Sequence, residues 1–182
     1  MKRIALFAFG VIAMSIGAFA QAPGADIETP LLALPANLRE GAGVVKWKPD
    51  HTYDTLKKST NGLVCYDRSG FPLQVAFSME CAAEANLPRV KQNMEAEALG
   101  DKAKSEAKLN EEEKAGTRVK PVFGSVWYHL MGPTKEMART HMTIAVPGAT
   151  MATMGLPENG RQGGVWIMNA GTTTAHLMTP GE

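Results

Sequence analysis

The sequence predicts an α+β fold: a single domain with a mainly antiparallel sheet and a central helical segment packed on one face. Strand-like patterns occupy the chain between Val44 and Phe77. The segment from Cys81 to Ala115 then lacks aromatic residues and is rich in Ala, Glu and Lys. Strand patterns return after Arg118. Because strands and helices are grouped rather than alternating, α+β is favoured over a parallel βαβ fold.

The first twenty residues have the layout of a secretory signal peptide. Lys2 and Arg3 precede an apolar run, and Ala18-Phe19-Ala20 closes it with small residues at the two positions that a signal peptidase reads. The run is shorter than the roughly 20 residues of a membrane span. We therefore predict a signal peptide at residues 1–20 and a periplasmic or secreted bacterial protein, with no membrane attachment after cleavage.

Residues 21–43 are rich in Ala, Pro and Gly, and we expect an extended N-terminal arm with a short helical turn around Pro35 to Glu40. The single α+β domain is predicted to span residues 44–182. Its first strands are expected at Val44–Lys48, Leu63–Tyr66 and Leu73–Phe77. Turn signals at Asn61-Gly62 and Asp67–Gly70 separate them.

Helical spacing follows in the central segment. Leu87, Val90 and Met94 recur at intervals of three and four, with Pro88 at a helix start. Gly100 should interrupt the run. The second half is highly charged and should face water, burying only a thin stripe at its small and apolar positions, which are Leu99, Ala103 and Ala107. Later strands are expected at Val119–Met131, His141–Val146, Val165–Asn169 and Thr174–Met178.

Charge and cysteine content limit the classes of partner. Loss of Lys2 and Arg3 on export would change the formal net charge from +1 to −1, so no basic surface for nucleic acid is expected. Cys65 and Cys81 are the two cysteines, 16 positions apart. In an oxidising compartment such a pair predicts a structural disulfide, and the Cys-x-x-Cys spacing of a redox-active pair is absent.

No signature of an enzyme is present in the sequence. The Gly-x-Ser-x-Gly elbow, the His-Glu-x-x-His motif, the phosphate loop and the dinucleotide fingerprint are all missing. No catalytic residue is therefore assigned. One enzymatic alternative is a hydrolase with His129 or His141 as the base, beside a carboxylate such as Asp50, Asp54 or Asp67.

Histidine and methionine gather in the last third of the chain. His129 lies two positions before Met131, His141 precedes Met142, and His176 lies two positions before Met178. Residues two apart on a strand share one face. Imidazole with thioether sulfur is a ligand set that suits Cu(I). The strand face carrying His129, Met131, His176 and Met178 is the candidate site, with Trp127 and Trp166 as its walls; buried structural roles for the same residues are the alternative.

The spacing His141-Met142, Met154, His176-x-Met178 is similar to the copper-binding pattern of periplasmic cupredoxin-like copper chaperones, His-Met-x10-Met-x21-His-x-Met. That resemblance implies His141, Met154, His176 and Met178 as ligands. The first gap is one residue longer here, and Thr-Thr-Ala replaces the family's Gly-Gly-Tyr/Phe before the last His-x-Met.

A second resemblance covers more of the domain. Its motifs are Thr60-Asn61-Gly62-x-x-Cys65 with a second cysteine, Gly163-Gly164-x-Trp166-Ile167-Met168 and Ala175-His176-x-Met178-x-Pro180. They resemble a group of exported bacterial proteins of unknown function, which implies kinship of fold and export. Together these patterns favour a non-enzymatic exported binding or accessory protein that could bind Cu(I). A structural or protein-interaction module with no metal site is the alternative.

Overall fold

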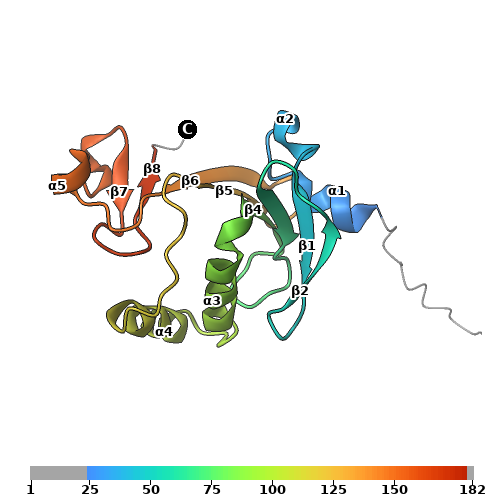
Figure 1. Ribbon diagram of the computed structural model, residues 1–182, viewed down its shortest axis with the longest axis horizontal. Coiled ribbons are helices and arrows are strands. Elements are labelled where there is room, and N and C mark those ends of the chain that lie inside the picture. The colour runs from blue at the N-terminus through green and yellow to red at the C-terminus, as the bar shows by residue number, and fades with distance from the viewer. Residues whose placement is uncertain (1–23, 180–182) are drawn as a thin grey trace, which may run out of the picture.

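The computed structural model describes residues 24–179, so the predicted signal peptide and residues 21–23 lie outside the described residues. Eight strands form one sheet in the order β2-β1-β3-β4-β5-β6-β8-β7, and the fold is α+β as predicted (Figure 1). The strands are β1 (Gly43–Trp47), β2 (Tyr53–Lys57), β3 (Leu63–Asp67), β4 (Phe77–Ala83), β5 (Val126–Gly132), β6 (Arg139–Ala145), β7 (Trp166–Met168) and β8 (His176–Met178).

Every strand pair is antiparallel except β1 with β3. The chain turns back after β1 to form the edge strand β2, then returns to the other side of β1 as β3. β4, β5 and β6 follow as consecutive antiparallel neighbours. This order brings β5 and β6, which carry His129 and His141, side by side in the sheet.

Helix α3 (Leu87–Glu97) covers one face of the sheet. Its buried side chains Leu87, Val90 and Met94 pack against Val45, Trp47, Val64 and Tyr66 of the first strands. Pro88 lies in the first turn, where its missing N–H costs no hydrogen bond. The helical spacing seen in the sequence therefore marked the buried stripe correctly.

Helix α4 (Lys102–Lys114) follows after Gly100, whose φ of 66° prevents the continuation of α3. The Asp101 side chain caps α4 by accepting from the Lys104 N–H at 2.9 Å. The predicted stripe was wrong, because Leu99, Ala103 and Ala107 are exposed. The helix instead turns Ser105, Lys108, Leu109, Glu112 and Glu113 toward the protein.

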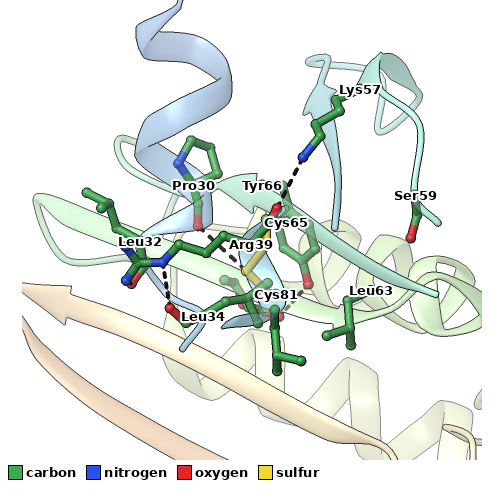
Figure 2. The surroundings of a disulfide bond; sticks show 12 residues. Pro30, Leu32, Leu34, Arg39, Lys57, Ser59, Leu63, Cys65, Tyr66 and Cys81 are labelled. Atoms are coloured by element: carbon green, nitrogen blue, oxygen red, sulfur yellow. Dashed lines mark hydrogen bonds between the residues drawn. A yellow bond between two sulfur atoms is a disulfide. The ribbon is translucent and has the colours of Figure 1, made fainter. Parts of the chain in front are cut away.

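The opposite face of the sheet is covered by the N-terminal segment (Figure 2). The prediction of an extended arm was wrong for the described residues, which form α1 (Ala25–Leu31) before α2 (Ala36–Arg39). The turn expected near Pro35 is α2. Leu31, Ala33 and Leu34 are buried against β1, β3 and β4, and Lys57 of β2 donates to the carbonyl of Glu40 at 2.7 Å. This segment is part of the core.

Cys65 and Cys81 form the predicted disulfide beneath this segment. The two residues are directly opposite each other on β3 and β4, and both are fully buried. The Sγ atom of Cys81 lies 3.6 Å from the carbonyl oxygen of Pro30 (Figure 2). Cys81 therefore belongs to a strand, and the helical segment begins later than the sequence indicated, after the short 3-10 helix Glu84–Asn86.

The C-terminal residues form a smaller lobe at the far end of the sheet (Figure 1). Its core contains Val146, Ala149, Ile167 and Ala175, with Met154 of α5 (Met151–Met154) packed against it. A 3-10 helix at Gly160–Gln162 leads to β7. The strands predicted here are present at nearly the expected positions.

Three strand predictions need correction. The strand expected at Leu73–Phe77 is irregular up to Ala76, and β4 begins at Phe77. The long strand expected at Val119–Met131 begins only at Val126. The edge strand β2 was not predicted. Among the described residues, no helix has the length and apolar character needed to cross a membrane.

Candidate functional site

A row of polar side chains crosses four strands on the face that α3 covers. The register pairs Tyr66 of β3 with Glu80 of β4, Glu80 with His129 of β5, and His129 with His141 of β6. Directly paired residues on neighbouring strands share one face. The row begins in the core, where Tyr66 is fully buried, and ends at His141, which is exposed.

The inner end of the row is a buried network of charges. The Tyr66 hydroxyl donates to Glu80 Oε1 at 2.6 Å, and Arg68 lies 3.6 Å from Glu80 Oε2. Arg68 also pairs with Glu97 of α3, which accepts a second hydrogen bond from Gln74 at 2.8 Å. Burial raises the pKa of Glu97, although Arg68 opposes that shift. Burial likewise raises the pKa of Tyr66, so the phenol stays protonated and remains a donor.

His129 connects this network to the outer strands. Its Nδ1 lies 3.8 Å from Glu80 Oε2, beyond hydrogen-bond length but within reach of an ion pair. Burial lowers the pKa of His129, with Glu80 acting against that shift, so the neutral ring is favoured near neutral pH. The ring centroid of His141 lies 5.9 Å from that of His129. The two imidazoles are thus neighbours, one half-buried and one exposed.

The predicted methionines of this face lie on either side of the histidine pair. Met131 is two residues beyond His129 on β5, so it shares that face. The β6–β8 register pairs Ala145 with His176, which places Met178 opposite Thr143 and on the same face. Thr143 is two residues from His141, or about 7 Å along the strand. Met178 is therefore nearer to the pair than His176 is.

His176 occupies a separate position on this face. Its partner Ala145 is four residues from His141, about 13 Å along β6. The His176 Nδ1 is 2.8 Å from the carbonyl oxygen of Thr174. Trp127 pairs with Thr143, and Trp166 pairs with Met178, so the two tryptophans named as walls lie on the same face.

Met154 is not brought to this face. It packs in the C-terminal core beside Leu177, whose side chain points to the opposite side of β8 from His176 and Met178. The ligand set His141, Met154, His176 and Met178 that the copper-chaperone spacing implied is therefore split between two sides of the sheet. Within residues 24–179, no group of three His, Cys, Asp or Glu side chains is placed to hold a metal ion.

The carboxylates considered for a histidine base lie elsewhere. Asp54 pairs with Lys48 at 2.6 Å, Asp50 accepts from the Thr52 hydroxyl at 2.6 Å, and Asp67 accepts from the Ser69 N–H at 2.6 Å. The carboxylate beside His129 is Glu80, which the sequence did not indicate. Glu80 lies between the strand predicted at Leu73–Phe77 and the helical segment predicted from Cys81, and only the β4–β5 register shows its partner.

Comparisons with protein families, with curated proteins and with solved structures found no match for this chain. Support for a function therefore comes from the site itself. Its two notable properties are an exposed imidazole paired with a half-buried one, and a buried carboxylate behind the latter.

Proposed function

We propose that the protein is an exported, non-enzymatic binding protein that holds Cu(I) between His129 and His141. The observation that carries the proposal is the placement of the two imidazoles at directly paired positions of β5 and β6, with ring centroids 5.9 Å apart. With metal–nitrogen distances of roughly 2 Å, one ion bound to both rings places their centroids about 6 Å apart. The observed spacing fits such an ion.

The neighbouring side chains match the preferences of Cu(I). Thioether and imidazole ligands suit this soft ion, whereas Mg²⁺ and Ca²⁺ prefer oxygen ligands. Met131 and Met178 lie on the same face; Met131 is two positions from His129 on β5, and Met178 lies on β8 opposite Thr143, which is two positions from His141. Met131 is the nearer candidate for a third ligand, since it lies on the same strand as His129 and methionine has three rotatable bonds.

Glu80 is the carboxylate nearest to the second ring nitrogen of His129, at 3.8 Å from Nδ1. A metal-bound imidazole commonly directs its other ring nitrogen to a carboxylate or a carbonyl group, which sets the tautomer. Here the Nδ1 of His129 faces Glu80, so its Nε2 is the nitrogen left for a metal. The Tyr66 hydroxyl and Arg68 hold Glu80 in place from the other side.

The proposal is tested by competitive Cu(I) titration against a chromogenic chelator under reducing, anaerobic conditions that leave the buried disulfide intact. We expect one equivalent to bind to the wild type and His141→Ala to weaken binding at least tenfold. His141 is exposed, so this variant should fold normally. Equal affinity of the wild type and His141→Ala would overturn the proposal and leave the metal-free interaction module.

The matched control is His51→Asn. His51 lies in the turn between β1 and β2 with a φ of 59°, a conformation that Asn adopts more readily than most residues. This change removes a histidine far from β5 and should leave Cu(I) affinity unchanged. His176→Ala should have a smaller effect than His141→Ala, because His176 lies opposite Ala145 rather than next to the pair.

Export is part of the proposal and has its own test. The layout of residues 1–20 and the buried Cys65–Cys81 disulfide support an oxidising compartment. Mass spectrometry of the native protein should find a chain beginning at Gln21 with no free thiol. A full-length chain with two free thiols in the cytosol would contradict export.

A further inference from the structure

A cleft of about 300 Å³ separates helices α3 and α4 from strands β5, β6 and β8. Leu109 of α4, Trp127 of β5, Ala145 of β6 and Pro121 of the loop before β5 give it an apolar part. The Glu97 carboxylate and the His176 imidazole also line it. Two buried arginines, Arg89 and Arg118, line it on the α3 side. The volume is at the lower end of the range for pockets that hold small molecules.

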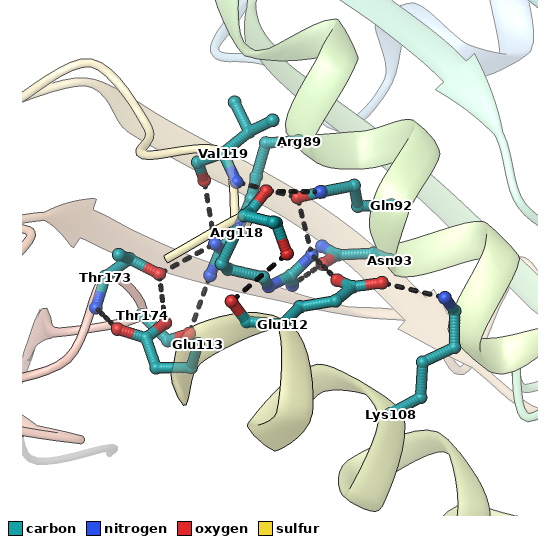
Figure 3. Close-up of polar contacts among 11 residues, drawn as sticks. Arg89, Gln92, Asn93, Lys108, Glu112, Glu113, Arg118, Val119, Thr173 and Thr174 are labelled. Atoms are coloured by element: carbon teal, nitrogen blue, oxygen red, sulfur yellow. Dashed lines mark hydrogen bonds and ion pairs between the residues drawn. The ribbon is translucent and has the colours of Figure 1, made fainter. Parts of the chain in front are cut away.

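Arg89 is the unusual residue of this cleft. It is only 3% exposed. Its guanidinium donates to the Val119 carbonyl at 2.8 Å and to the hydroxyls of Thr173 and Thr174 at 2.9 and 2.6 Å (Figure 3). None of the ion pairs within residues 24–179 includes Arg89. A buried cation whose direct partners are all neutral is uncommon.

The other buried arginines have carboxylate partners. Arg68 pairs with Glu80 and Glu97, and Arg118 lies 3.6 Å from Glu112 Oε2. In the part of the chain that the structure describes, Arg89 is connected to a carboxylate only through Thr173. The Thr173 hydroxyl accepts from Arg89, and the Thr173 N–H and hydroxyl both donate to Glu113 (Figure 3). Burial, with repulsion from Arg118, lowers the pKa of Arg89 to about 10, although the charges of Glu113 and Glu112 act against that shift. An anion in the cleft would oppose this shift by stabilising the charged guanidinium.

We propose that this cleft binds a small organic carboxylate with an apolar or aromatic body, its carboxylate beside Arg89 and its body against Leu109, Pro121 and Trp127. The planar guanidinium is suited to carboxylates, and hydrogen bonds between two charged groups are roughly twice as strong as neutral ones. The apolar lining favours the body of the ligand over inorganic phosphate or sulfate. The site is distinct from the histidine pair, and the proposal does not depend on Cu(I) binding.

The first test uses isothermal titration calorimetry on the wild type with 2-naphthoate and its neutral counterpart 2-naphthamide. We expect saturable one-to-one binding of 2-naphthoate, at least tenfold tighter than that of the amide. Equal affinity for the two probes would overturn the role of Arg89. The absence of saturable binding of 2-naphthoate up to its solubility limit would overturn the site.

Variants locate the binding. Arg89→Gln should weaken 2-naphthoate at least tenfold and leave 2-naphthamide nearly unchanged. Because Arg89→Gln also removes bonds to the Val119 carbonyl and to the turn that precedes β8, Leu109→Trp provides a second route: it fills the cleft from α4 and should abolish binding of both probes. Unchanged binding in Leu109→Trp would place the probe elsewhere and refute the proposal.

Two controls separate this cleft from the rest of the molecule. Arg39→Gln changes an arginine on the opposite face of the sheet, where its Nε donates to the Leu34 carbonyl at 2.8 Å, and should leave 2-naphthoate binding intact (Figure 2). His141→Ala should also leave it intact, whatever its effect on Cu(I). A loss in either variant would contradict a site at Arg89.

Discussion

Replacement of Arg68 by methionine should strongly destabilise the protein. Arg68 is 2% exposed and is the cation between two carboxylates, Glu80 and Glu97. It also lies 5.6 Å from the ring centroid of Phe71, so its charge has an aromatic contact as well. Arg68→Met keeps a long apolar stem but leaves both carboxylates without their cation.

The magnitude follows from two opposing effects. Removal of one partner from a buried ion pair costs about 3–5 kcal/mol, because the remaining charge stays buried. The Arg68 Nε is buried without a hydrogen-bond partner, and its removal returns about 1 kcal/mol. We therefore expect Arg68→Met to lower the free energy of unfolding by about 3 kcal/mol. That is a large part of the roughly 5–15 kcal/mol of a typical domain.

Urea denaturation followed by far-UV circular dichroism, with the disulfide kept oxidised, measures this change. The matched control is Lys48→Met, which breaks the exposed Lys48–Asp54 pair and should change the free energy of unfolding far less than Arg68→Met does. Adding Glu97→Gln to Arg68→Met should recover part of the loss, because one uncompensated carboxylate disappears. If Arg68→Met and Lys48→Met are equally stable, the buried network does not contribute as argued.

Three further predictions concern the fold. The double variant Cys65→Ala, Cys81→Ala should lose about 3 kcal/mol of stability in thermal or urea unfolding, because the bond closes a loop of sequence separation 16; a loss below about 1 kcal/mol would contradict this. Leu34→Ala should cost about 2–5 kcal/mol, since Leu34 is 1% exposed; a neutral result would show that the N-terminal segment is not part of the core. Because the pKa of Glu97 is raised on folding, its protonation favours the folded state, and this contribution is lost as pH rises through the folded pKa. The wild type should therefore gain stability relative to Glu97→Gln as the pH falls from 7 toward 4.5, and a constant difference would be inconsistent with the raised pKa.

The strands and helices that were predicted correctly are those whose side-chain pattern matches their burial. β1 and β3 carry β-branched and aromatic residues that are buried on both faces, and α3 shows a stripe with helical spacing. β2 has no such pattern, because an edge strand with Tyr53, Asp54, Thr55 and Leu56 all exposed needs no alternation. It is held by backbone bonds to β1 rather than by burial.

The remaining errors arise where distant contacts override local preference. Residues 79–83 include Met, Glu and Ala, which favour helix, yet they lie in the central strand β4 between β3 and β5. Pro30 stands near the end of α1 and made that segment resemble an extended arm, but burial of Leu31 and Leu34 on the sheet stabilises the helical form. No local pattern could indicate these partners.

In the candidate site, too, some features follow from local sequence patterns and others depend on contacts between distant strands. Strand alternation correctly placed His129 and Met131 on one face, and likewise His176 and Met178. Which histidines are neighbours depends on register: β5 pairs His129 with His141, whereas β6 pairs His176 with Ala145. Register is set by long-range strand pairing, so neither the role of Glu80 nor the separation of Met154 could be read from spacing.

The position of the histidine pair follows from where the helical layer ends. α3 covers the row at Tyr66 and Glu80, so the inner groups are held by buried hydrogen bonds and charges. The outer half of β6 has no such cover, since residues 139–142 are all exposed. His129 is therefore packed at the edge of the core, whereas His141 is exposed to solvent. A metal ion could approach from the open side and be held from the buried side, whereas a histidine pair wholly inside the core would offer no entry path.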